Sequence, residues 1–188
     1  MSVEDITHTL VDEHRLILRM IALLEKNASL TAAGEYLNWQ FYLDVIDFIR
    51  NYADRFHHAK EEDVLFKALV DNGMPKDNSP VAAMLMEHDQ GRNFVRDLEA
   101  AVHKAATNNT ERCQAVAENA LGYAALLRDH ICKEDEILYP LAERVLPESV
   151  RFDILQRYQA AEEQAHLKSF EALVTQYEQD NQYHGESR

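Results

Sequence analysis

Two segments of the sequence each place a histidine four residues before a glutamate. One pair is His57 and Glu61, in FHHAKEEDVLF, and the other is His130 and Glu134, in HICKEDEILY. Residues four apart point to the same side of a helix. An imidazole and a carboxylate are costly to bury on an apolar helix face unless they bind something. Because the arrangement occurs twice, we expect both pairs to serve one metal centre.

A lone histidine precedes each pair. These residues are His14 and His88, and each directly follows a glutamate. The interval from His14 to His57 is nearly the same as the interval from His88 to His130. Matched intervals of this kind indicate a duplicated helical hairpin. We therefore expect a pseudo-twofold four-helix bundle in which each hairpin contributes one lone histidine and one histidine–glutamate pair.

The rest of the sequence supplies the helices that such a centre needs. Apolar residues recur at three- and four-residue intervals, and only 5 glycines and 4 prolines occur. The predicted helices cover residues 3–27, 35–71, 80–106, 111–145 and 149–180. Residues 27–34 should form a loop, and Pro140 should disturb the end of the fourth helix. We predict one all-α domain over residues 1–188: an up-down-up-down four-helix bundle over 3–146 with an additional C-terminal fifth helix at 149–180.

The doubled histidine of the first pair has to be resolved by helical spacing. His57 and Glu61 lie on the apolar stripe of the second helix. The neighbours of His58 and Glu62 at the same spacing are mostly polar. We therefore expect His57 and Glu61 to face the core, and His58 and Glu62 to face water.

Four imidazoles and two carboxylates are then expected to converge in one core. The candidate metal ligands are His14, His57, Glu61, His88, His130 and Glu134. Any one of them alone would be an ordinary packed or surface residue, but burying all six without a cation would be costly. This donor set suits iron, and also manganese or zinc. Two histidines per metal and two bridging glutamates would leave positions open for water, O₂ or another small ligand.

Composition limits the partners. The chain has 19 Lys and Arg against 33 Asp and Glu, for a formal net charge of −14, which disfavours binding to nucleic acid. The N-terminus has no apolar signal segment, and no apolar run is long enough to span a membrane. Cys113 and Cys132 have no disulfide or CxxC spacing. We expect a cytoplasmic protein, monomeric or homodimeric, whose partner is a small molecule.

The motif as a whole resembles that of a known family. In chain order it consists of Glu13-His14, His57-x-x-x-Glu61, Glu87-His88 and His130-x-x-x-Glu134. Over about residues 3–146 the chain resembles the hemerythrin-like HHE cation-binding domain family. The resemblance implies a four-helix bundle holding two iron ions in a non-haem di-iron centre, with a bridging carboxylate from each hairpin. All six candidate ligands fall on matching family positions.

Some positions depart from particular members of the family. Arg92 stands where oxygen-carrying hemerythrins have a second histidine. Their last carboxylate is an aspartate five residues after its histidine, as Asp135 is here, but Glu134 lies on the His130 stripe and matches Glu61. The four-His, two-Glu set is closer to hemerythrin-type proteins implicated in iron–sulfur cluster repair, whose Cys-containing N-terminal segment is absent.

Two side chains remain open as additions to the site. His166, with Glu162 or Glu163 one turn before it, could be a seventh ligand, a cap over the bundle or a packed residue. Tyr123 lies two turns before His130 on the same face and is either a core neighbour of the ligands or a ligand itself.

Three functions fit this centre. The first is a di-iron protein that binds or reacts with O₂, nitric oxide or peroxide as a sensor, scavenger or iron store. The second is a redox enzyme, of the peroxide-decomposing or iron–sulfur cluster repair type. The third is an interaction module whose core the metal staples.

Overall fold

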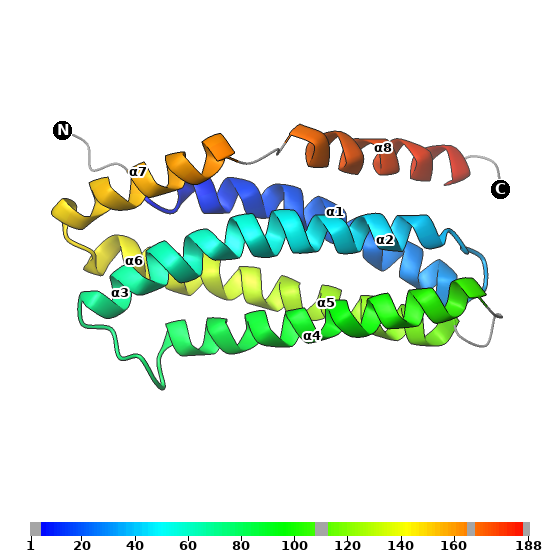
Figure 1. Ribbon diagram of the computed structural model, residues 1–188, viewed down its shortest axis with the longest axis horizontal. Coiled ribbons are helices and arrows are strands. Elements are labelled where there is room, and N and C mark those ends of the chain that lie inside the picture. Colours follow the sequence, from blue (N-terminus) through cyan, green and yellow to red (C-terminus); the bar gives the residue numbers. More distant parts are fainter. Residues whose placement is uncertain (1–4, 108–112, 165–167, 186–188) are drawn as a thin grey trace.

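The computed structural model describes residues 5–107, 113–164 and 168–185, and within them every regular element is helical. The predicted all-α class is therefore confirmed for this part of the chain. None of the helices formed by these residues is both long and apolar enough to cross a membrane. Figure 1 shows the longest helices lying side by side along the long axis of the molecule.

The elements follow one another in the order that the hydrophobic pattern predicts. The first predicted helix corresponds to α1 (His8–Ala32). The second contains four consecutive elements, α2 (Trp39–Phe48), η1 (Ile49–His58), η2 (Glu61–Phe66) and α3 (Lys67–Asp71). The third predicted helix corresponds to α4 (Pro80–Thr107). The fourth contains α5 (Cys113–Lys133), η4 (Glu134–Leu138) and α6 (Tyr139–Val145). The region predicted as a fifth helix contains α7 (Glu148–Gln164) and α8 (Lys168–Gly185).

The long segments pack against one another to enclose a common core. α1 packs against α5, α4 against α5, and α2 against α4. α7 lies against η2 and α8 against α1, so that both extend along one side of the longer helices (Figure 1). Segments that are distant in the sequence therefore line the same interior.

The loop predicted at residues 27–34 is wrong for most of its length, because α1 continues to Ala32. Thr31 is buried, and its hydroxyl donates a hydrogen bond to the carbonyl of Tyr36 while lying 2.6 Å from the hydroxyl of Tyr42. These tertiary contacts hold the last turn of the helix. The chain reverses at Gly34, whose φ of +75° favours glycine.

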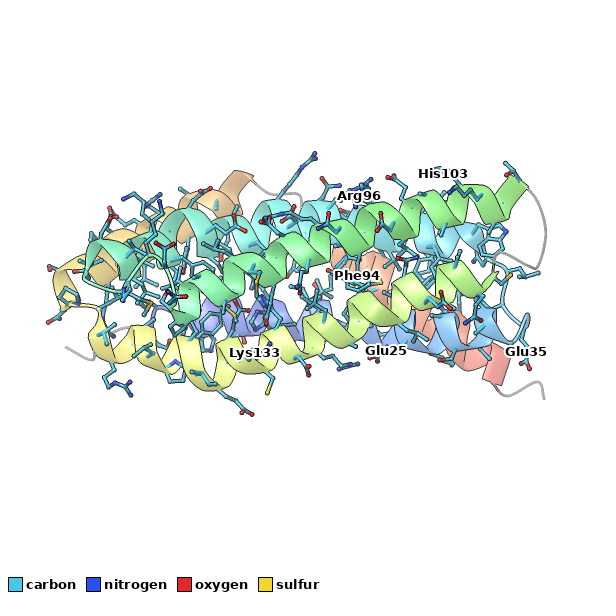
Figure 2. The ribbon with its side chains drawn as sticks, turned by 90° about the horizontal axis from the view of Figure 1, so that it is seen from below. Glu25, Glu35, Phe94, Arg96, His103 and Lys133 are labelled. Carbon is cyan, nitrogen blue, oxygen red and sulfur yellow. The ribbon has the colours of Figure 1, made fainter. Side chains whose placement is uncertain are left out.

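Two apolar clusters fill the interior, and the candidate ligands lie where they meet. On α1, Leu10 belongs to one cluster and Ile17 to the other, with His14 between them. Candidate ligands on the other three segments also lie at this junction. Figure 2 shows side chains filling the space between the helices along the length of the molecule. The fold thus sets a polar layer inside an otherwise apolar core.

The helices are widened at that layer. The segments η1, η2 and η4 are π-helical, and they contain His57, Glu61 and Glu134. Pro140 follows η4 at the start of α6, in agreement with the predicted disturbance. π-helical turns are rare and are often found at functional sites. Their presence in both halves of the duplicated motif indicates that the backbone is adapted to this layer.

Candidate metal centre

The polar layer contains two pairs of facing histidines. Nε2 of His14 lies 2.9 Å from Nε2 of His57, and Nε2 of His88 lies 3.0 Å from Nε2 of His130. All four rings are almost completely buried. Each pair joins the lone histidine of one helix to the histidine of the following His-x-x-x-Glu motif.

Two glutamates lie between these pairs. The Oε2 atom of Glu61 is 3.7 Å from Nε2 of His57 and 3.5 Å from Nε2 of His88. The Oε2 atom of Glu134 is 3.2 Å from Nε2 of His130 and 3.4 Å from Nε2 of His14. Each carboxylate therefore reaches one histidine of each pair, which is the placement that a bridge between two metal ions requires.

The outer nitrogen of each histidine is held by a carboxylate. The Nδ1 pairs are His14 with Asp135 at 2.8 Å, His57 with Glu13 at 2.8 Å, His88 with Glu62 at 2.7 Å and His130 with Glu87 at 3.0 Å. An ionised carboxylate only accepts hydrogen bonds, so each Nδ1–H donates and each Nε2 is left to present its lone pair to the centre. Metal-binding histidines almost always show this arrangement.

These histidine–carboxylate pairs follow the same twofold duplication as the candidate ligands. Glu13 and Glu87 precede the lone histidines in sequence, and each binds the histidine of the following pair. Glu62 and Asp135 follow the central glutamates, and each binds a lone histidine of the other hairpin. Asp135 therefore contacts the outer nitrogen of His14, whereas Glu134, which is 0% exposed, lies between the two histidine pairs.

In each half of the centre a lysine donates to one of the outer carboxylates, and the two lysines differ in burial. Lys60 donates to Glu13, and Lys133 donates to Glu87 at 2.5 Å. Lys60 is only 2% exposed, and its ammonium lies 3.9 Å from the ring centroid of Phe56, whereas the Lys133 side chain is 43% exposed. Burial raises the pKa of Glu13 to about 7, although the charge of Lys60 counteracts it.

Several buried carboxylate oxygens of the centre lack hydrogen-bond partners among the described residues. Within the described residues, Oε2 of Glu61 and both carboxylate oxygens of Glu134 are buried without a hydrogen bond. Buried polar atoms without partners cost about 1–3 kcal/mol each, and more when they are charged. Two facing nitrogen lone pairs also repel one another unless a proton or a cation lies between them. The residues present therefore fit one cation in each half of the centre.

Burial and neighbouring charges shift the pKa values of the central groups in opposite directions. Burial, together with the nearby charge of Glu134, raises the pKa of Glu61 well above its usual value. Burial opposes ionisation of Glu134, but the imidazoles of His130 and His14 outweigh it and hold that pKa low. Burial also opposes the charging of His14, yet Asp135 and Glu134 raise its pKa to about 9. A bound cation would displace these protons.

One tyrosine beside the centre was not identified from the sequence. The ring of Tyr139 stacks on His14 with centroids 5.6 Å apart, and its hydroxyl donates to Oε1 of Glu61 at 2.5 Å. Phe66, at the matching position of the first hairpin, stacks in the same way on His88 at 5.9 Å. Aligning the two halves of the sequence on their His-x-x-x-Glu motifs would have revealed Tyr139 as a polar replacement within the repeat.

The prediction that His58 faces water is wrong. His58 is 7% exposed, and its ring stacks on His88 with centroids 3.8 Å apart. Nδ1 of His58 lies 3.3 Å from Oδ1 of Asp54. A π-helical turn takes more residues than an α-turn, so adjacent residues such as His57 and His58 diverge less and both can turn inward. Glu62, which was also expected to face water, is partly buried and pairs with Nδ1 of His88.

His166, with Glu162 or Glu163, and Tyr123 were the possible additions to the six candidate ligands. His166 lies outside the described residues, as does the side chain of Glu163. Glu162 approaches Lys60 at 3.9 Å rather than any candidate ligand. Tyr123 is buried beside the centre, and its hydroxyl has no hydrogen-bond partner within the described part of the chain. The six predicted side chains come together, and their binding of metal stays a prediction.

Comparisons with known proteins support the same reading. The family model described as "Hemerythrin HHE cation binding domain" matches residues 5–142. No significant match was found among curated proteins or solved structures. The matched range contains all six candidate ligands and the four carboxylates that hold their imidazoles.

Proposed function

The chain belongs to the hemerythrin HHE cation-binding domain family, and from this premise we propose that it holds two iron ions that bind or react with a small ligand. The bundle would have up-down-up-down topology over residues 3–146, within a single domain that includes the C-terminal helices. The ligand would be O₂, nitric oxide or peroxide. The protein would act as a sensor, scavenger or iron store in the cytoplasm, as a monomer or homodimer.

The observation that carries this proposal is the pair of facing Nε2 atoms in each half of the centre, joined by carboxylates that reach both halves. His14 with His57, and His88 with His130, would each hold one ion. Imidazole and carboxylate donors suit iron, manganese and zinc, and we favour iron because of the family resemblance. When bound, a pair of iron ions would supply redox chemistry and open positions for the ligand.

Several residues around the candidate ligands would prepare the centre for a cation. The four outer carboxylates orient the imidazoles and keep Nδ1 protonated. The hydroxyl of Tyr139 restrains Glu61 through its hydrogen bond. The two apolar clusters lie on either side of the polar layer and limit the access of water to it, except at the cavity beside His88 and His130. This arrangement lets the side chains meet a cation with little reorganisation.

Metal analysis tests the proposal directly. Protein purified after iron loading under air should contain two irons per chain and should show near-ultraviolet absorption from oxygen ligands bound to iron. Exposure of the reduced protein to nitric oxide should change that spectrum. A preparation with well under two metals per chain, and no spectral response, would contradict the proposal.

The redox-enzyme alternative is supported by one observation, a cavity beside His88 and His130 that is large enough for a small reactant. Repeated turnover of peroxide that is lost in Glu61→Ala would favour an enzyme, whereas a single stoichiometric reaction would favour a sensor, scavenger or iron store. The third function, a metal-stapled interaction module, would be favoured if metal removal lowered the melting temperature and no small ligand changed the spectrum.

A further inference from the structure

A cavity of about 100 Å³ lies beside one half of the centre. It is lined by His88 and His130, whereas His14 and His57 do not line it. Its wall also includes Arg92, whose side chain is 40% exposed, so the cavity extends toward the surface. A water molecule occupies about 30 Å³ in the liquid, so there is room for a molecule of a few heavy atoms. Such a molecule would lie against the histidines of one predicted ion and not against those of the other.

Gly91 on α4 borders this cavity, and the duplication of the sequence shows what it replaces. Gly91 follows His88 by three residues, and the residue that follows His14 by three is Ile17. The side chain of Ile17 is 2% exposed and belongs to the apolar cluster on that side of the centre. The first half of the centre therefore has a packed side chain at the position where the second half has none.

Neither the backbone nor the packing of α4 requires a glycine at this position. Gly91 lies inside a regular helix and does not share the positive φ of Gly34 and Gly73. Apart from its own helix, a Cβ atom at Gly91 would meet only Cε2 of Tyr123, at the ordinary contact distance of 3.5 Å. Glycine is less favourable than alanine inside a helix. The effect of Gly91 is therefore the space that it leaves beside the ring of Tyr123.

The other glycine inside a long helix of the bundle has a different reason. A Cβ atom at Gly122 on α5 would lie 2.6 Å from Cε1 of Phe94, a distance that real Cβ atoms do not show. Close packing against Phe94 thus accounts for Gly122. No such neighbour accounts for Gly91 among the described residues, which leaves the cavity as its structural consequence.

The wall of the cavity suits an uncharged molecule. Apart from imidazoles, its buried part is formed by Ile49, Val95, Leu127 and the ring of Tyr123. The charged side chains of the wall are already paired, as Arg50–Glu99, Arg92–Asp54 and Glu87–Lys133. An ion or a strongly hydrated molecule would lose its hydrogen bonds to water against the apolar part of this wall, which is costly. A weakly hydrated molecule has little to lose there.

From these observations we infer that Gly91 opens the His88–His130 half of the centre to an uncharged diatomic molecule, which approaches the ion held there through this cavity. This inference rests on the proposed function, and it specifies the class of ligand and the half that receives it. O₂ and nitric oxide belong to this class. Hydrogen peroxide, which forms hydrogen bonds with water at both ends, does not. The His14–His57 half would then hold an ion that packed side chains enclose.

The rate of nitric oxide binding to the reduced, iron-loaded, full-length protein tests this assignment. Gly91→Ala adds a methyl group that the structure accommodates, and Gly91→Leu adds a larger side chain at the cavity wall. Stopped-flow absorption should show association slowed slightly in Gly91→Ala and by about 10-fold or more in Gly91→Leu, because the ligand has to displace the added atoms. Ala100→Leu, at an exposed position of the same helix, is the matched control and should leave the rate unchanged.

Xenon gives a second measurement that needs no iron. Xenon is uncharged and enters apolar cavities, so crystals of the metal-free protein under xenon pressure should contain xenon beside Gly91. Crystals of Gly91→Leu should contain none there. Both variants should retain two irons per chain after iron loading. The melting temperature of Gly91→Ala should not fall, because alanine is the better helix former.

The outcomes separate this inference from the proposed function. Equal association rates in the unaltered protein and in the Gly91 variants that retain two irons would overturn the inference, because the ligand would then reach the iron by another path. Water without xenon in the cavity would also overturn it. An unaltered protein that holds two irons but binds no nitric oxide and no O₂ would instead contradict the proposed function, whatever the Gly91 variants do.

Discussion

Tyr139 and Glu61 are joined by a hydrogen bond of 2.5 Å across 78 residues of sequence, and Phe66 occupies the equivalent position in the other half of the centre. The hydroxyl of Tyr139 is therefore one of the features that distinguish the two halves, together with the burial of Lys60. It restrains one of the two carboxylates expected to bridge the metals. This relationship leads to the first prediction.

Replacement of Tyr139 by Phe should lower the free energy of unfolding by about 1–3 kcal/mol, because the buried carboxyl of Glu61 loses its donor. Chemical denaturation of the metal-free protein measures this change. Tyr158→Phe serves as a control that removes a buried hydroxyl without a partner, and it should be neutral or slightly stabilising. Equal effects of the two substitutions would show that the Tyr139 hydrogen bond contributes nothing.

Substitution of the doubled histidine should separate its two members. His57→Ala should lose at least one metal ion per chain, because Nε2 of His57 faces Nε2 of His14. His58→Ala should retain both ions, because His58 is stacked on His88 rather than directed at a shared ion. Elemental analysis after dialysis measures both. The prediction fails if His58→Ala loses as much metal as His57→Ala.

The outer carboxylates should affect metal affinity without touching metal. Glu13→Gln and Glu87→Gln each remove the carboxylate that holds the Nδ1 atom of a histidine. We expect a loss of about 10- to 100-fold in metal affinity for each, which competition with a chelator measures. Glu25→Gln, at an exposed pair with Arg128, is the control and should have no effect.

The same two variants should differ in stability. Glu13→Gln removes the carboxylate that contacts the buried ammonium of Lys60 and leaves Glu162 at 3.9 Å, a change of the kind that costs up to about 3–5 kcal/mol. Glu87→Gln leaves Lys133 half-exposed to water, and the loss should stay below about 1 kcal/mol. Thermal and chemical unfolding of the metal-free variants will check this order. A larger loss for Glu87→Gln would contradict it.

Metal affinity should fall as pH falls. The pKa of His14 is raised to about 9 and that of Glu61 is also raised, so the metal-free protein at neutral pH carries protons that a cation must displace. Binding therefore releases protons, and the apparent affinity rises with pH until it passes the pKa of His14. Zinc titrations in buffers of different ionisation enthalpy count the protons released. An affinity that is constant between pH 7 and 9 would be incompatible with a protonated His14.

The spacing of the ligands, the duplication and the helical segments were readable from the sequence, because helical periodicity is local. Residues four apart share a helix face wherever the helix packs. The ends of helices were less predictable. α1 passes through its predicted loop because Thr31 finds partners at Tyr36 and Tyr42, which are contacts made after the chain reverses.

Tertiary structure alone decided which residues complete the centre. The carboxylate partners of the imidazoles come from other helices, as with His14 and Asp135, which are 121 residues apart, and no local pattern pairs them. The inward position of His58 depends on π-helical widening, which the regular 3.6-residue pattern does not contain. The sequence by itself determined which side chains are suited to bind metal. Packing of the four segments decided how those side chains are oriented, and placed His58 and Tyr123 at a cavity beside them.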